Sequence, residues 1–432
     1  MTFRIGRRQF LMGSSALIAA GAAGFSPAFA QGNPLRMIWW GGQARADRTL
    51  AVADAYADAK GITPLEGEFL SWNDYWPKLA TQTAGGTAPD ILQMDYRFIV
   101  EYASRNAIAP LDEYVGGVLD LSDFDEDQLE GGKVGGKLYG LSLGANSVAM
   151  LANSTAFEEA GLTVPGMDWT YDTLRELGEA FKAANIRGGM KAMSDASGAE
   201  PMLDNWIRQR GKALYTPEGK LGPDADDMVE WFTMWNEFRD AGYIVSAEDN
   251  ALDTGAPETS MVAMSKAALL PSNSNQLVIH QSVSKDNLTI TSYPRIAAGV
   301  GGGHYRKPSQ FWSIAGSSQN KEAAAEFLSY FINDTEAGKV LGVERGIPCS
   351  AKVRDAVAPT LSEQDQIALN FVANLGDLLG PLPASPPNAA GEIDTSLLRV
   401  LSQEVAFGAR SAEDAGKFFV EEATAILNRA AV

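Results

Sequence analysis

The sequence contains almost no cysteine and almost no histidine. Among its 432 residues there is one cysteine, Cys349, and there are two histidines. A single thiol cannot form an internal disulfide, and a metal site needs several such ligands close together. We therefore expect no disulfide framework, no metal and no other cofactor. The motifs G-x-S-x-G and H-E-x-x-H are missing as well, which argues against the hydrolases that use them.

Basic residues are also scarce. The chain has 35 Lys and Arg against 54 Asp and Glu, which gives a net charge of −19. Residues 1–30 hold three arginines and no acid, so the chain without them carries −22. A charge of this sign argues against nucleic acid and against an anionic membrane as partners.

Long apolar runs are missing beyond the first 30 residues. There, arginines precede a Gly/Ala-rich apolar stretch at 10–25, and residues 28–30 fit a small-x-small cleavage site, which indicates an export signal. The segment GRRQFLM favours the twin-arginine type, with an ordinary Sec signal as the alternative. No cysteine lies near the cleavage site. We therefore expect a soluble periplasmic protein with no lipid anchor and no membrane insertion.

The pattern that follows predicts a parallel α/β lobe. Apolar runs at 35–40, 66–70 and 90–94 read as strands, and the segments 45–59 and 74–83 have helical spacing. Alternation of strands and helices favours a parallel sheet with ligands beyond its carboxyl ends. About 400 residues are too many for one core, so we expect a second lobe.

Several segments together resemble one known family. They are WWGG, FLSWNDYWPKLATQTAGG, PDILQMDYRFI, GKLYGLSLGANSVAMLANSTAFEEAGL, KPSQFWSIAGSSQNKEAAAEFL and GVERGIPCS. They are similar to the extracellular sugar-binding proteins that serve ABC importers, known as solute-binding family 1. Within it they resemble a branch tied to plant cell-wall oligosaccharides, including pectin fragments.

The resemblance implies the two-lobed periplasmic-binding-protein fold. Each lobe would be a mostly parallel sheet flanked by helices, the lobes would be linked by a hinge, and extra helices would follow at the C-terminus. Three crossings are expected near 144–147, 289–298 and 346–350. The N-lobe would then hold 31–144 and 298–346, and the C-lobe 147–290 and 350–432.

The resemblance also implies a function. A monomer would capture an oligosaccharide between its lobes by hinge closure and then dock on an inner-membrane ABC permease pair, with no covalent chemistry. Two alternatives stay open: a secreted carbohydrate-active enzyme such as a polyuronide lyase, and a binding protein for a non-sugar solute such as a polyamine.

Sugar sites need aromatic platforms beside groups that donate and accept hydrogen bonds. Trp40 and Trp72 follow the first two strands and are the candidate platforms, with Gly41 and Gly42 beside them. Trp39 alternates with Trp40, so one of the pair is expected to face the core.

Charged and polar groups follow further strands. Asp95 and Tyr96 come after the third strand and are candidates for hydroxyl binding and stacking. Arg45 and Arg48 follow the WWGG turn, and a carboxylate-bearing sugar would explain two arginines at the mouth of a cleft. Arg97 would add to this set, and a solvated arginine is the plain alternative.

The remaining candidates lie on the hinge and the second lobe. Polar loops and a glycine-rich loop could face the cleft there, although asparagines fit turns equally well. The candidates are Asn146 in the first crossing, Asp195, Glu200, Asn273 and Asn275 in polar loops, and Gly302, Gly303 and His304 in a loop returning to the first lobe.

Overall fold

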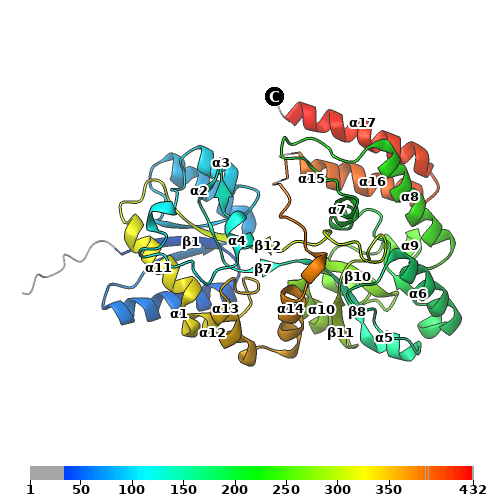
Figure 1. The fold of residues 1–432 in the computed structure, drawn as a ribbon, viewed down its shortest axis with the longest axis horizontal. Coiled ribbons are helices and arrows are strands. Elements are labelled where there is room, and N and C mark those ends of the chain that lie inside the picture. Colours follow the sequence, from blue (N-terminus) through cyan, green and yellow to red (C-terminus); the bar gives the residue numbers. More distant parts are fainter. Residues whose placement is uncertain (1–33, 385, 388, 431–432) are drawn as a thin grey trace, which may run out of the picture.

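The computed structural model describes residues 34–384, 386–387 and 389–430, without the side chains of Trp72 and Asn73. The export signal expected at residues 1–30 lies outside this range. Two α/β lobes stand side by side, joined by extended segments that include β7 and β12 (Figure 1). The expected two-lobed α/β fold with additional C-terminal helices is confirmed.

The N-lobe is built on a five-stranded sheet with the order β2-β1-β3-β13-β6. Its strands are β1 (Arg36–Trp40), β2 (Glu66–Leu70), β3 (Ile91–Met94), β6 (Leu141–Ser142) and β13 (Phe311–Ile314). β1 pairs in parallel with β2 and β3, whereas β13 runs antiparallel to both of its neighbours. The expected helices are α1 (Gln43–Lys60) and α2 (Trp72–Ala84), the latter capped by the Ser71 hydroxyl.

Both faces of the N-lobe sheet are buried at β1, β3 and β13, whereas the edge strand β2 is largely exposed. Because side chains alternate along a strand, Trp39 packs into the core on one face and Trp40 into the core on the other. Trp39 lies edge-on to Trp312, and Trp40 lies edge-on to Tyr75. This arrangement explains why β1 is apolar at successive positions.

The C-lobe sheet has the order β11-β8-β10-β9. Its strands are β8 (Val148–Asn153), β9 (Lys191–Met193), β10 (Ala267–Asn273) and β11 (Leu288–Thr291). β9 and β10 are parallel, and β8 runs antiparallel to both of its neighbours. Each sheet is therefore mostly parallel in strand direction, with one reversed strand, β13 in the N-lobe and β8 in the C-lobe. β8 and β13 each begin at the hinge, where the parallel strands of their sheet end. They therefore run antiparallel to those strands.

Helices cover the C-lobe sheet and extend beyond it. They include α5 (Ser154–Glu159), α6 (Tyr171–Ala184), α7 (Glu200–Gln209), α8 (Ala225–Asp240), α16 (Arg399–Ala406) and α17 (Ala412–Ala430). In Figure 1 α17 lies along α8, and the aromatic residues Trp206, Trp231 and Trp235 are buried in the core of this lobe. Within the described residues no helix is long and apolar enough to cross a membrane.

Two of the three expected crossings lie elsewhere. The chain passes from β6 through β7 (Ala145–Asn146) into β8, but residues 289–298 do not cross back, because β11 pairs with β8 in the C-lobe. The return runs through β12 (Lys307–Pro308), which pairs with β7. The second crossing therefore falls near 305–309.

The third crossing also falls later than expected. After residue 350 the chain continues in the N-lobe as α13 (Ala351–Val357), where Arg354 pairs with Asp125 at 2.5 Å. It reaches the C-lobe at α14 (Glu363–Ala373), which packs on α10 (Leu277–Val283) and on β11. Residues 350–357 thus belong to the N-lobe.

The remaining elements are α11 (Lys321–Asn333), a core helix of the N-lobe that packs on β13, and several short segments. The short segments are α3 (Ile99–Ser104), α4 (Glu126–Glu130), α9 (Ala247–Asn250), α12 (Thr335–Leu341), α15 (Ala390–Glu392), β4 (Lys133–Val134), β5 (Lys137–Leu138), the π-helical η7 (Ile393–Leu398) and the 3-10 turns, among them η6 (Gly376–Leu378).

Candidate functional site

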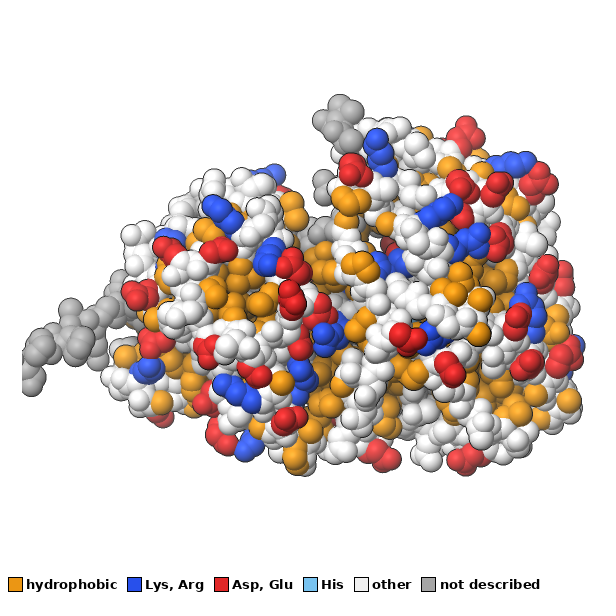
Figure 2. Space-filling model, in the orientation of Figure 1, with side chains coloured by type: hydrophobic (Ala, Val, Ile, Leu, Met, Phe, Trp, Pro, Cys, Tyr) orange, Lys and Arg blue, Asp and Glu red, His pale blue; other side chains and the backbone are white. Residues whose placement is uncertain are grey.

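A cavity of about 270 Å³ lies between the two lobes. Figure 2 shows the hollow that separates the lobes on the surface. The polar or aromatic side chains that line the cavity are Tyr96, Arg97, Glu200, Asp204, Tyr215, Asn273, Tyr305 and Lys307. A second cavity of about 180 Å³ shares Asn273, Tyr305 and Lys307 and adds Asn146, Asn275, Gln276 and Ser309. The two cavities adjoin and form one inter-lobe site, which we call the cleft.

The N-lobe contributes the turn after β3. The Asp95 carboxylate accepts a hydrogen bond from the backbone N–H of Arg97 at 2.9 Å, which tightens the turn. Tyr96 and Arg97 extend from it to line the cleft, and the Tyr96 hydroxyl donates to the carbonyl of Pro383 at 2.7 Å. This turn therefore brings one aromatic ring and one cation to the site.

The C-lobe contributes two carboxyl groups from α7. Glu200 is the first residue of the helix and Asp204 lies one turn further, so both side chains are on the same face. Burial and the neighbouring carboxylates of Asp204 and Asp394 raise the pKa of Glu200 to about 7, although Lys307 and Arg97 lower it. Burial raises the pKa of Asp204 to about 6, against the Arg208 charge. Both acids accept protons close to neutral pH.

Lys307 is the cation at the floor of the cleft. It lies in β12, beside the hinge strand β7. Burial lowers the pKa of its amine, an effect that Asp95 and Glu200 oppose. Neither Lys307 nor Arg97 forms an ion pair with any described residue. Both cations are thus available to an anionic group of a ligand.

Two tyrosines complete the wall, the half-buried Tyr305 and the buried Tyr215. Tyr305 carries the Arg208 guanidinium 5.0 Å above its ring, and burial raises the pKa of its hydroxyl. Tyr215 is only 6% exposed, and its hydroxyl has no hydrogen-bond partner among the described residues. A buried hydroxyl without a partner is costly, so a ligand that bonds to it would relieve the cost.

Of the sequence candidates, the structure brings Tyr96, Asn146, Glu200, Asn273 and Asn275 together in the cleft. Asp95 stands directly beside them, and its carboxylate faces Lys307. The side chain of Trp72 is not described. These residues come from the two lobes and from the hinge.

The turn after β1 is not part of the cleft. Trp40 is 8% exposed and is enclosed by Tyr75 and Trp76, so its ring is a core element and not an open platform. Gly41 lies against the side chain of Arg45, and Gly42 precedes α1 as its cap.

Arg45 and Arg48, predicted at the mouth of a cleft, do not line the two cavities. Arg45 pairs with Glu344 at 2.8 Å and donates to the carbonyl of Trp40. Arg48 donates to the carbonyl of Leu341 at 2.7 Å. Both arginines therefore bind the chain segment after α12, within the N-lobe.

Asp195 serves a different purpose from the predicted one. It forms a buried ion pair with Arg239 at 3.0 Å, with 3% and 6% of the two side chains exposed. It lines a separate groove of about 340 Å³ within the C-lobe, together with Arg399 and Gln403. The loop that carries it turns to α16 and not to the N-lobe.

The loop that holds Gly302, Gly303 and His304 is a packing element. His304 is 1% exposed, and its Nε2 accepts a hydrogen bond from the backbone N–H of Tyr293 at 3.1 Å. Burial lowers the pKa of His304 to about 3, so the ring is neutral. Gly302 donates to the carbonyl of Leu378, and Gly303 lies against Asn205. These three residues join β11 to the segment around η6 and do not line the cleft.

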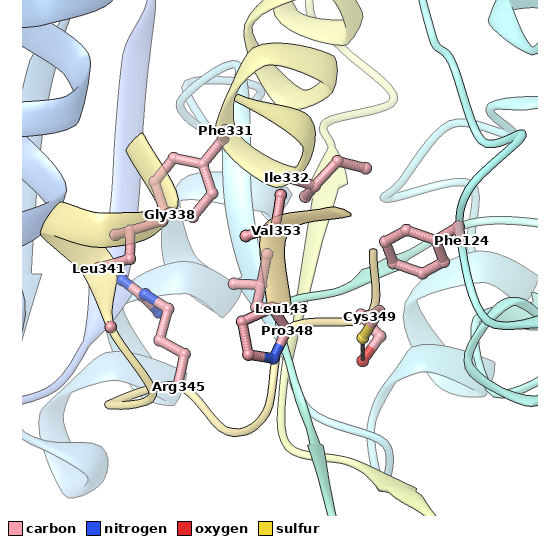
Figure 3. A pocket seen from close by; sticks show the side chains of 12 residues that line it. Phe124, Leu143, Phe331, Ile332, Gly338, Leu341, Arg345, Pro348, Cys349 and Val353 are labelled. Atoms are coloured by element: carbon pink, nitrogen blue, oxygen red, sulfur yellow. Dashed lines mark hydrogen bonds between the residues drawn. The ribbon is translucent and has the colours of Figure 1, made fainter. Parts of the chain in front are cut away.

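A small cavity of about 30 Å³ lies inside the N-lobe and has no part in the cleft (Figure 3). Its lining is mainly apolar and includes Phe331, Val353 and Cys349. Burial raises the pKa of the Cys349 thiol to about 12, so the thiol stays protonated and inert.

Sequence reasoning missed Asp204, Tyr215, Tyr305 and Lys307. Asp204 could have been found, because it follows Glu200 by one helical turn. Lys307 could not, because only the pairing of β12 with β7 brings it to the hinge.

Comparisons with known proteins agree with this architecture. Residues 51–367 match the model of the bacterial extracellular solute-binding protein family. A family 1 extracellular solute-binding protein from Alicyclobacillus acidocaldarius superposes with a TM-score of 0.79 at 28% identity, covering 92% of this chain and 99% of that one. A periplasmic oligogalacturonide-binding protein from Yersinia enterocolitica superposes with a TM-score of 0.77 at 23% identity, covering 92% of this chain and 99% of that one.

The curated relatives match over shorter stretches. A putative binding protein of Brucella abortus is 32% identical over 113 residues, which is 26% of this chain and 27% of the relative. A carbohydrate ABC transporter substrate-binding protein of Streptococcus pneumoniae is 30% identical over 141 residues, 32% of this chain and 28% of the relative. The matched stretches thus span about a quarter of these relatives' length.

Proposed function

Because the chain belongs to the bacterial extracellular solute-binding proteins, we propose that it is the substrate-binding component of an ABC importer for oligosaccharides. The glycan would bind in the cleft and stabilise a closed arrangement of the two lobes, which would then dock on a permease pair in the inner membrane. The protein would act in the periplasm as a monomer, without chemistry of its own.

The lining of the cleft is the observation that carries this proposal. Sugars present apolar C–H faces and hydroxyls that both donate and accept hydrogen bonds. Tyr96, Tyr215 and Tyr305 offer rings from both sides, while Asn273 and the two α7 acids offer polar partners. The unpartnered Tyr215 hydroxyl is a buried group that a sugar hydroxyl can satisfy.

A uronate-containing glycan fits the charges of the cleft best. Arg97 and Lys307 form no ion pair with any described residue, so a sugar carboxylate can pair with them. The acids Glu200 and Asp204 face the cations across the cleft and would receive sugar hydroxyls. The oligogalacturonide-binding neighbour from Yersinia enterocolitica is consistent with this choice.

Two other functions draw on parts of the same site. A polyuronide lyase would use a base beside a carboxylate-binding cation, and Lys307 stands near Glu200. A polyamine would pair with Glu200 and Asp204, but Lys307 and Arg97 would repel it. Unsaturated products from polyuronides would favour the lyase, and a stabilising effect of spermidine alone would favour the polyamine binder.

A thermal-shift panel tests the proposal. The purified protein is heated with neutral oligosaccharides, oligogalacturonides and spermidine at matched concentrations. A ligand at about 100 times its dissociation constant adds roughly 2.7 kcal/mol to the free energy of unfolding, which is a visible rise in melting temperature. We expect the rise with the acidic glycans. A panel without any glycan response would contradict the assignment to oligosaccharides.

A further inference from the structure

A proline-rich segment runs between the two lobes. We call residues 380–384 and 386–387 the strap; it holds prolines at 381, 383, 386 and 387. In Figure 1 the orange trace that follows the hinge rises between the two lobes, and residues 383, 384 and 386 line the cleft. The strap therefore lies across one side of the cleft.

The strap is fixed to both lobes. On the C-lobe side, Gly380 donates its N–H to the carbonyl of His304 at 2.8 Å, and Arg208 donates to the carbonyl of Pro381 at 2.5 Å. On the N-lobe side, the carbonyl of Pro383 accepts the Tyr96 hydroxyl bond at 2.7 Å. Proline fixes the backbone φ angle, so a segment with four prolines has few alternative shapes.

The strap forms part of the cleft wall. Pro383, Ala384 and Pro386 line the cavity of about 270 Å³ together with Glu200 and Asp204 on α7. A glycan chain that bound by an internal segment would have to leave the site on two sides. The strap occupies one of those sides with stiff backbone and apolar rings.

We propose that the strap makes the cleft a blind pocket, which takes the end of a glycan chain and excludes its internal segments. This inference rests on the proposed function. It adds which part of a glycan chain the cleft recognises, namely its end. Short oligosaccharides and chain ends bind; a long chain offers one site at its end, however many units it contains.

The stoichiometry on polymers of different length tests the inference. The full protein is titrated calorimetrically with digalacturonate and with two size fractions of polygalacturonate, each at a known concentration of chains. We expect one protein per chain for both fractions and similar affinity per chain. A number of bound proteins that rises with chain length would overturn the blind pocket.

A strap variant supplies the reverse experiment. Pro383→Gly combined with Pro386→Gly keeps the length of the strap and removes its stiffness, and we expect more than one protein per long chain. Pro165→Gly, in a loop that does not line the cleft, is the matched control for loss of a loop proline. A stoichiometry of one for the strap variant on the long chains would mean that the strap is not the barrier and would overturn the inference.

The result for digalacturonate separates the two proposals. If the wild-type protein binds neither digalacturonate nor a neutral oligosaccharide, the proposed function fails and the inference fails with it. If digalacturonate binds but the long polymer takes up several proteins per chain, only the inference fails.

Discussion

Two turns of the N-lobe begin at the carboxyl ends of neighbouring parallel strands, yet only one of them reaches the cleft. The turn after β1 leads into α1, whose Arg45 pairs with Glu344 and thereby ties this region to the segment after α12. The turn after β3 carries Tyr96 and Arg97, which line the cavity. Strand direction places both turns at one edge of the sheet. The segment after α12 packs beside the turn after β1, whereas the turn after β3 remains open to the cleft.

The difference matters for the charge of the site. In the first turns of α1, Arg45 and Arg48 both bind partners within the same lobe. At the cleft, Arg97 and Lys307 line the same cavity, and neither forms an ion pair with a described residue. Both sets of cations follow strands of the N-lobe sheet or lie in the hinge, but only Arg97 and Lys307 keep their charge available to a ligand.

The largest expected effect concerns Trp40, the last residue of β1. Because its ring fills the core between Tyr75 and Trp76, Trp40→Ala should lower the free energy of unfolding by about 3–5 kcal/mol in urea denaturation. Phe69→Ala, at a ring that is 38% exposed, should cost clearly less. If Trp40→Ala left stability intact but abolished glycan binding, Trp40 would be a ligand platform after all.

The next effect concerns protonation of Glu200. Its pKa rises from 4.5 unfolded to about 7 folded, so the native state holds a proton that the unfolded state releases. The contribution of Glu200 to the free energy of unfolding is fully present below pH 4.5 and is lost as the pH rises through 7. The free energy of unfolding therefore falls by about 3 kcal/mol between these two pH ranges because of this group. Glu200→Gln should therefore be more stable than the wild type at about pH 8 and similar at about pH 5.

Melting curves at the two pH values check this prediction. Glu363→Gln, at an exposed position on α14, is the matched control and should show the pH dependence of the wild type. An unchanged pH dependence in Glu200→Gln would mean that Glu200 is solvated and does not face the cleft.

A smaller effect is expected for Tyr215. Its hydroxyl has no partner among the described residues, so Tyr215→Phe should leave the melting temperature of the free protein unchanged or slightly raised. The variant should lose about 0.5–1.5 kcal/mol of binding free energy for the best glycan of the panel, measured by calorimetry. Loss of stability without loss of affinity would place the hydroxyl in an internal network instead.

The smallest effect is expected for Arg48. Because its guanidinium donates to the carbonyl of Leu341 and does not line the cleft, Arg48→Ala should change glycan affinity by less than about 0.5 kcal/mol. Affinity for an acidic glycan is the quantity to measure. A loss of tenfold or more, about 1.4 kcal/mol, would return this arginine to the binding site.

The fold was predictable because its signals are local. Buried strands separated by amphipathic helices identified the N-lobe, and the small residues of 144–147 lie where the chain passes from β6 to β8. The site was predictable only where a candidate follows a strand or begins a helix, as Tyr96 and Glu200 do. Lys307 and the strap depend on pairings between segments far apart in sequence, which no local pattern records.

The wrong candidates have a common cause. Arg45, Asp195 and His304 are polar residues in loops, where the sequence suggests exposure. Each is instead satisfied by a partner from a distant segment: Arg45 by Glu344, Asp195 by Arg239, and His304 by the Tyr293 backbone. Long-range partners of this kind turn candidate binding groups into structural ones.

One affinity measurement tests the contrast between the two cation sets most directly. Trigalacturonate is titrated calorimetrically into the wild-type protein, Lys307→Met and Arg45→Met under identical conditions. We predict that Lys307→Met loses about 2–4 kcal/mol of binding free energy and that Arg45→Met binds like the wild type. Loss of binding in Arg45→Met together with full binding in Lys307→Met would contradict the placement of the ligand in the cleft.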